Sequence, residues 1–138
     1  MRFRDYISTK DIAAIYRIWR EIGWLREGAE EALAIALDAS RVRVAEIHGE
    51  AESVALSMPG TVCYLGEELP FCAITSVATS RIARRRGAAR RLTAQSVAAG
   101  VVNDGALVAG LGMFEQGFYN QLGFGTGGYE HLVTFDPE

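Results

Sequence analysis

The segment RRRGAARRL, residues 84–92, decides how the rest of the chain is interpreted. It places five arginines at the start of a stretch with helical character. A helix N-terminus already carries partial positive charge, so further cations there are unfavourable unless an anion binds. Two interpretations follow: a solvated surface in which the arginines pair with acidic side chains, or a site for a polyanion such as phosphate.

A glycine inside this segment is consistent with the anion site. A strand, a tight turn, a glycine and a helix leave backbone N–H groups directed at one point, and such points bind phosphate. Gly87 has no side chain, so a ligand can approach the backbone closely. Guanidinium groups add charge-assisted hydrogen bonds to phosphate oxygens.

The overall composition disfavours a nucleic-acid or membrane partner and indicates the number of domains. The chain has 138 residues, 49% of them hydrophobic, and a net charge of −3, which predicts one domain over residues 1–138. The acidic balance, and the lack of aromatic residues among the arginines, disfavour nucleic acid. No apolar run approaches the roughly 20 residues of a membrane span, and the opening MRFRDYIS lacks a secretory signal, so we expect a cytoplasmic protein.

The cysteines and histidines do not suggest a metal centre. Cys63 and Cys72 stand in apolar, strand-like segments without a CxxC motif, and we expect both to be buried free thiols. His48 and His131 are far apart in the sequence, and we expect both to be ordinary strand residues. The sequence therefore predicts no metal site.

Hydrophobic periodicity predicts an α/β protein, with a mixed and mostly antiparallel sheet flanked by helices. The helix at 8–22 has a Ser/Thr cap and ends at Gly23. The alternation in RVRVAEIHG, residues 41–49, contains one slip. The predicted order is strand 3–7, helices 8–22 and 27–40, strand 41–49, a turn at GEAE, strand 53–58, a further strand or extended arm, strand 71–79, helix 87–102, strand 106–112, helix 113–123 and strand 129–135.

Two motifs resemble those of a known superfamily. RRRGAA fits the pattern Arg/Gln-x-x-Gly-x-Gly/Ala and resembles the pyrophosphate-binding loop of the GCN5-related N-acetyltransferase (GNAT) superfamily. FYNQLGF, residues 118–124, resembles the signature near the end of that domain. More narrowly, the stretch from Gly66 to Gly127 resembles the N-terminal acetyltransferase domain of Eis-type (enhanced intracellular survival) proteins. The resemblance implies the GNAT fold, whose sheet splays beside the central strand.

The resemblance also implies acetyl-CoA as co-substrate, without a metal. Its pantetheine arm is expected to hydrogen-bond the central strand at Val77, Ala78 and Thr79. The pyrophosphate is expected to lie on the loop amides, with Arg84 holding the loop. These amides belong to Arg85, Arg86, Gly87, Ala88 and Ala89.

For the chemistry, Tyr119 matches the superfamily's general acid, and a phenol can protonate a thiolate leaving group. The alternative is a packed tyrosine with its hydroxyl at the surface. Attack by the amine needs mainly correct positioning, so we expect direct transfer in a ternary complex. No general base is assigned: Glu46, His48 and the pair Glu67 and Glu68 are each candidates acting through water.

In Eis-type proteins the base is the C-terminal carboxylate of a much longer chain, whereas this sequence stops at Glu138. A truncated chain, a short active relative and an inactive one are all compatible with that. A non-catalytic acyl-CoA-binding or interaction module is the alternative function.

The acceptor implied by the resemblance is an amine of a small molecule or peptide, held by the loop between the first two helices. There Trp24 and Leu25 are expected to wall an apolar slot, and Glu27, Glu30 or Glu31 to attract a cation. The alternative is that the apolar residues only pack and that the acids only favour a helix start. Apolar residues on the last strands of such a domain often contact a second copy, so a homo-oligomer is a possible assembly.

Overall fold

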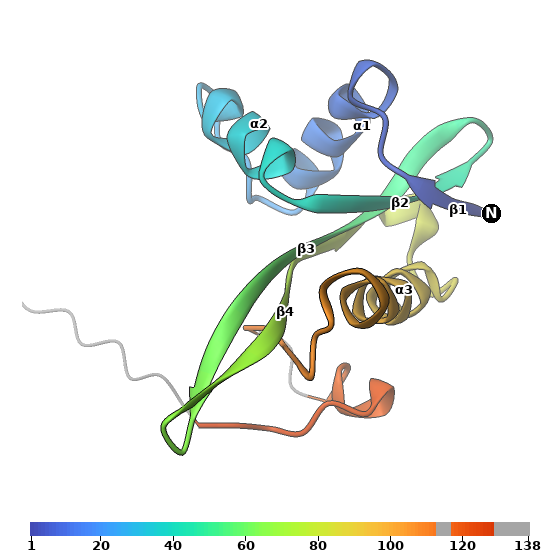
Figure 1. The fold of residues 1–138 in the computed structure, drawn as a ribbon. Helices are drawn as coiled ribbons and strands as arrows, with labels where there is room; N and C mark the ends of the chain where they lie inside the picture. The colour runs from blue at the N-terminus through green and yellow to red at the C-terminus, as the bar shows by residue number, and fades with distance from the viewer. Residues whose placement is uncertain (113–116, 129–138) are drawn as a thin grey trace, which may run out of the picture.

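The computed structural model describes residues 1–112 and 117–128 (Figure 1). Its elements are β1 (Arg2–Asp5), α1 (Ser8–Glu21), α2 (Glu30–Asp38), β2 (Arg41–Ile47), β3 (Glu50–Tyr64), β4 (Glu67–Thr79), the 3-10 turn η1 (Arg81–Ala83), α3 (Ala88–Asp104), β5 (Val108–Gly110) and the 3-10 turn η2 (Asn120–Leu122).

The strands form one sheet in the order β1-β2-β3-β4-β5. Neighbouring strands are antiparallel from β1 to β4, whereas β4 and β5 are parallel. Parallel neighbours need a crossover connection, which α3 supplies. The prediction of a mixed, mostly antiparallel sheet flanked by helices is confirmed.

The helices lie on both faces of this sheet (Figure 1). On one face Ile15, Ile18 and Trp19 of α1 pack against Val44 and Val54 of the sheet, and all five are buried. Burial of such side chains stabilises the fold by roughly 1.5–3 kcal/mol each. On the opposite face α3 buries Leu92 together with smaller residues, namely Ala88, Thr93, Ser96 and Gly100.

The contact between α3 and β4 is especially tight at one glycine. A Cβ at Gly100 would lie 2.6 Å from Sγ of Cys72 and 2.8 Å from its Cβ. The Cys72 thiol also donates to the Ser96 carbonyl at 3.8 Å. Because no larger residue fits at Gly100, this position fixes how closely the helix approaches the strand that precedes the arginine loop.

The predicted extended arm is confirmed. The strands β3 and β4 are 15 and 13 residues long and remain paired to Tyr64 and Glu67, where the hairpin turns at Leu65 and Gly66. The far part of this ribbon projects from the body (Figure 1). Pro59 is paired with Cys72, so it does not interrupt β3 as the sequence suggested.

Several local expectations are corrected. The N-terminus of α1 is not capped by Ser or Thr: the Ile7 N–H donates to Oδ2 of Asp11 at 2.8 Å. The second helix is shorter than predicted and runs only from Glu30 to Asp38. The slip in the 41–49 alternation is a bulge between Ala45 and Glu46. Of the helix predicted at 113–123, residues 117–123 form turns and η2 instead.

Two side-chain expectations are wrong. Cys63 is exposed, because it lies on the arm beyond the reach of the helices, whereas Cys72 is buried as expected. His48 is not a strand residue but stands exposed in the β2–β3 turn, with φ of 52°. The predicted strand 129–135, with His131, lies outside the described residues. No described helix is long and apolar enough to cross a membrane.

Candidate functional site

The segment between β4 and α3 forms a sharply turned loop. After η1, Arg85 has φ of 61° and Gly87 has φ of 75°, so two left-handed residues turn the chain into the helix. Gly87 is the N-cap of α3, and the N–H of Arg91 donates to its carbonyl at 3.1 Å. The amides at the first positions of a helix have no partner within the helix, so they are available to an anion.

The arginines at positions 84–91 differ in their pairing from several arginines elsewhere in the molecule, although among the described residues Arg2 and Arg26 also lack an ion pair. Arg4, Arg17 and Arg41 each pair with a carboxylate at 2.6 to 3.1 Å. In the ranges 1–112 and 117–128 no acidic side chain forms an ion pair with any of the exposed arginines Arg84, Arg85, Arg86, Arg90 and Arg91. Within the described residues, the interpretation of these arginines as an acid-paired surface is therefore not supported by any ion pair.

A bulge shapes the end of β4. The register with β3 shifts between Val54 and Leu56, and Ser76 of β4 has φ of 50°. A bulge reverses the alternation of side chains. Accordingly Ile74 packs on the α3 side before the bulge and Val77 does so after it, whereas Ala78 joins the core under α1.

The strand also has an open edge beyond its pairing with β5. The two strands pair only from Phe71 to Ala73, opposite Val108 to Gly110. Beyond Ala73, β4 pairs with β3 on one side, except at the bulge of Ser76 and Val77, and with no described strand on the other side. Val77, Ala78 and Thr79 all lie on this stretch. Backbone groups at such an edge can hydrogen-bond an extended ligand.

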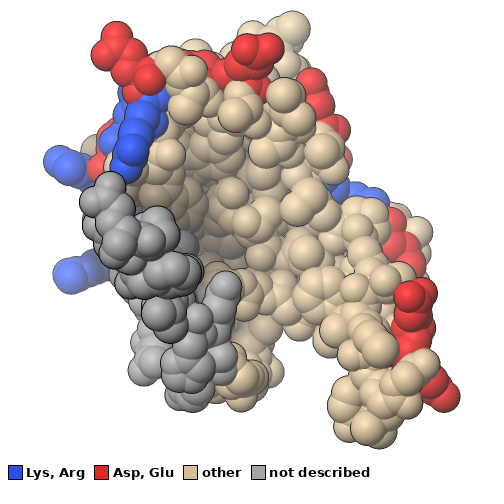
Figure 2. Space-filling model, turned by 90° about the vertical axis from the view of Figure 1, so that its left-hand side faces the viewer, with Lys and Arg blue, Asp and Glu red and all other residues tan. Residues whose placement is uncertain are grey.

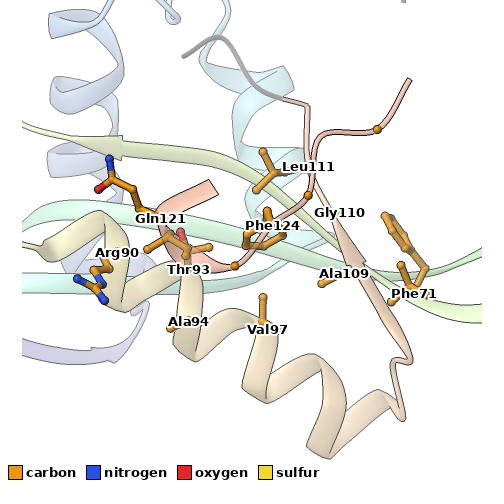
Figure 3. Close-up of a pocket in the computed structure, with 15 residues that line it drawn as sticks. Phe71, Arg90, Thr93, Ala94, Val97, Ala109, Gly110, Leu111, Gln121 and Phe124 are labelled. Atoms are coloured by element: carbon orange, nitrogen blue, oxygen red, sulfur yellow. The ribbon is translucent and has the colours of Figure 1, made fainter. Parts of the chain in front are cut away.

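A cavity of about 770 Å³ lies between α3, β5 and residues 121–127 (Figure 3). Arg90, Thr93 and Val97 line it from α3, Ala109 lines it from β5, and Phe124 closes another side. Its volume is in the range of ligand pockets, and most of its lining is apolar. Arg90 lies in the first turn of α3, three residues after Gly87, so the cavity begins close to the end of the arginine loop.

Comparisons with known proteins identify the family and the fold of this chain. A sequence profile described as "Acetyltransferase (GNAT) domain" matches residues 5–127. The chain belongs to the GNAT acetyltransferase family. A comparison with curated protein sequences gives no significant match.

Solved structures of similar fold include other acetyltransferases. An acetyltransferase from Trypanosoma brucei has a TM-score of 0.76 at 16% identity, over 97% of this chain and 99% of that one. A GCN5-related N-acetyltransferase from Kribbella flavida has a TM-score of 0.76 at 20% identity, over 88% of this chain and 33% of that one. Glucosamine-6-phosphate N-acetyltransferase from Arabidopsis thaliana has a TM-score of 0.70 at 14% identity, over 98% of both. At such identities the likeness is one of fold.

Within this GNAT domain, Tyr119 lies in the segment beside the cavity. Its ring makes edge-to-face contacts with Phe118, at a centroid distance of 4.9 Å, and with Phe124, at 6.0 Å. Its carbonyl accepts the N–H of Leu122 and of Phe124, which closes η2. Leu122 and Phe124 line the cavity. Tyr119 is hydrogen-bonded to both through its carbonyl, so it lies beside the cavity wall.

Trp24 and Leu25, the two residues expected at the acceptor, differ from each other in exposure. Leu25 is 7% exposed and belongs to the core under α1, whereas Trp24 is 46% exposed. The N–H of each donates to the Trp19 carbonyl, at 2.8 Å for Trp24 and 3.2 Å for Leu25. The loop after α1 is therefore folded back on the helix, with the Trp24 ring partly in solvent.

Of the candidate bases named in the sequence analysis, Glu46 lies on β2, His48 in the exposed β2–β3 turn, and Glu67 and Glu68 on β4. Hydrogen bonds from Lys10 and Arg4 lower the pKa of Glu46 to about 2, so its carboxylate is a weak base. Glu67 and Glu68 lie at the exposed tip of the arm, opposite Tyr64 and Cys63.

Sequence reasoning missed two contributors to the site. The bulge at Ser76 had no signal, because serine is not a residue type typical of positive φ. Glu21 accepts a hydrogen bond from the backbone N–H of Arg81 at 3.1 Å, across 60 residues of sequence. Nothing local to either residue could have predicted that contact.

Proposed function

We propose that this domain transfers the acetyl group of acetyl-CoA to an amine of a small molecule or peptide, by direct attack in a ternary complex. The observation that carries the proposal is one path along the chain: the open edge of β4, the loop with arginines that form no ion pair with a described acidic residue, and the N-terminus of α3. The pantetheine chain of acetyl-CoA and the pyrophosphate to which it is joined match this path. The strand edge offers backbone hydrogen bonds to the pantetheine chain, and the loop offers cationic and N–H donors to the pyrophosphate.

The proposed roles follow the path from one end to the other. Val77, Ala78 and Thr79 bind the pantetheine arm through their backbone. Arg84 holds the loop, and the amides of the following residues receive the pyrophosphate; these are Arg85, Arg86, Gly87, Ala88 and Ala89. The adjoining cavity with Arg90 at its edge provides room for the rest of the cofactor.

On the chemical side, we propose that Tyr119 protonates the thiolate as it leaves. A phenol retains its proton at neutral pH, so it can act as the acid. The amine must lose a proton before it attacks, and we assign no residue to this step. Deprotonation through water is compatible with a mechanism in which positioning supplies most of the rate.

The acceptor is proposed to bind beside Trp24 and Leu25. Figure 2 shows acidic side chains along the top of one face, the end at which Figure 1 places α1 and α2, with a hollow below them. The exposed Glu27 and Glu31 belong to this region of the chain. A negative rim attracts a protonated amine, which supports an amine acceptor. The narrower likeness to Eis-type proteins rests on the sequence motifs alone.

The test is an assay of thiol release from acetyl-CoA with a polyamine, an amino sugar and a lysine peptide as acceptors. Release that depends on both protein and amine, with the acetylated amine found by mass spectrometry, supports the proposal. Saturable acetyl-CoA binding without release for any amine would favour the non-catalytic module, and absence of binding would refute both.

A further inference from the structure

The entrance to the arginine loop is fastened to a different part of the fold. The N–H of Ser80, directly after β4, donates to the carbonyl of Glu52 on β3 at 2.9 Å. The N–H of Arg81, the next residue, donates to Oε2 of Glu21 at 3.1 Å. Two successive amides are thus held from two elements, one of them by the last side chain of α1.

Arg17 joins the two glutamates. Its Nη1 donates to Oε1 of Glu21 at 3.1 Å, and its Nη2 donates to Oε1 of Glu52 at 3.0 Å. Nη2 also donates to the carbonyl of Ala51 at 3.3 Å. Glu21 therefore presents one oxygen to a guanidinium on its own helix and the other to the chain that enters the loop.

This network is partly buried. Glu52 is 5% exposed, and the side chain of Glu21 is 27% exposed. The backbone N–H of Arg81, and after it Arg17, holds the pKa of Glu21 below its ordinary value, so the carboxylate is charged at neutral pH. A charged acceptor makes a stronger hydrogen bond to an N–H than a neutral one does.

We propose that Glu21 is a positioning residue for the cofactor: its carboxylate fixes the backbone at Arg81 and thereby the direction of the loop amides up to Gly87. The inference rests on the proposed function, because the loop is taken to receive pyrophosphate. The chain from η1 to the N-cap of α3 is short, and Arg85 and Gly87 both have left-handed backbones. A change of direction at Arg81 is therefore passed on to the amides of the loop.

The experiment compares acetyl-CoA affinity in four proteins: the wild type, Glu21→Ala, Glu21→Gln and Glu50→Ala. Loss of the charge-assisted hydrogen bond in Glu21→Ala should raise Kd about tenfold. Glu21→Gln keeps an oxygen that can accept from Arg81, so its Kd should stay within about threefold of the wild type. Glu50→Ala is the matched control, because Glu50 lies 3.8 Å from Arg17 without contacting the loop.

Kd is measured by calorimetric titration well below the melting temperature, where every variant is folded, so a change in Kd does not arise from lost stability. The amide NMR chemical shifts of the ligand-free proteins report separately on the loop backbone. We expect Glu21→Ala, but not Glu50→Ala, to shift the Gly87 N–H as well as the Arg81 N–H. Should Glu21→Ala fail to fold, Glu21→Asp replaces it, since the shorter carboxylate retains its charge but retracts from Arg81, and the same loss is expected.

The outcomes distinguish this inference from the proposed function. Wild-type affinity in Glu21→Ala, with shifts confined to Arg81, overturns the positioning role and leaves the acetyl-CoA site intact. Absence of binding by the wild type overturns the proposed function. In that case the NMR shift of the Gly87 N–H tests the effect of Glu21 on the loop: a shift in Glu21→Ala supports it, and an unchanged Gly87 N–H contradicts it.

Discussion

Replacing Gly87 with glutamate should abolish acetyl-CoA binding and leave the fold in place. A Cβ at Gly87 meets nothing within 4 Å, so the new side chain has room. The backbone φ of +75° is the cost, because a residue with a side chain loses roughly 1–2 kcal/mol in this region. A domain stable by about 5–15 kcal/mol tolerates that loss.

The effect on the ligand is much larger than this strain. The carboxylate would stand where the pyrophosphate is proposed to lie. Two unit charges about 6 Å apart in an effective dielectric of about 20 repel by about 3 kcal/mol. That repulsion alone raises Kd about 100-fold, before any steric overlap is counted.

Gly105 provides the matched control. It ends the same helix with φ of +65°, and a Cβ there also meets nothing within 4 Å. Glu at Gly105 therefore carries a similar conformational cost at the opposite end of α3. Isothermal titration with acetyl-CoA should show lost affinity only for Gly87→Glu. Urea unfolding should show both variants folded, with Gly105→Glu less stable by up to about 1 kcal/mol because negative charge is unfavourable at a helix C-terminus. A Kd for Gly87→Glu within twofold of the wild type would refute the placement of the pyrophosphate.

Three further predictions concern the chemistry and the fold. Tyr119→Phe should lower kcat at least tenfold with acetyl-CoA Kd nearly unchanged, measured by thiol release and titration; unaltered kcat would remove Tyr119 from the mechanism. Glu46, whose pKa is lowered from 4.5 to about 2 chiefly by Lys10, contributes stability that is present above pH 4.5 and lost as the pH falls towards 2. Glu46→Gln should therefore differ from the wild type in urea unfolding at pH 7 and converge with it in acid, whereas a constant difference would contradict the assignment. Gly100→Ala should destabilise by about 1–2 kcal/mol net of its helix propensity. Cys72→Ala should relieve part of this in the double variant, because it removes Sγ but keeps the Cβ; simple additivity would contradict the contact with Sγ.

The sequence could predict features that depend on local pattern. Helical spacing located α1 and α3, and the interrupted alternation at 41–49 corresponds to the bulge at Ala45 and Glu46. The glycine after the arginines is the N-cap of α3, where a left-handed residue is needed. Each of these follows from the residue type and its near neighbours.

What the sequence could not predict depends on contacts between distant elements. Asp11 caps α1 because Arg4 of β1 holds its carboxylate with bonds of 2.6 and 2.8 Å. The bulge at Ser76 is set by the pairing of β4 with β3. Glu21 reaches the loop only because α1 lies across the sheet. Local propensity contains no information on such pairings, which arise from tertiary packing.

The most direct measurement is a thermal-shift titration with acetyl-CoA, with S-acetyl-pantetheine, which lacks the pyrophosphate, as the comparison. Binding to the native state at 100 times Kd stabilises by about 2.7 kcal/mol, which raises the melting temperature by several degrees. The account predicts a saturable rise with acetyl-CoA and little or none with S-acetyl-pantetheine. Equal effects of the two ligands, or no effect of acetyl-CoA, would contradict the central claim that the arginine loop binds a pyrophosphate.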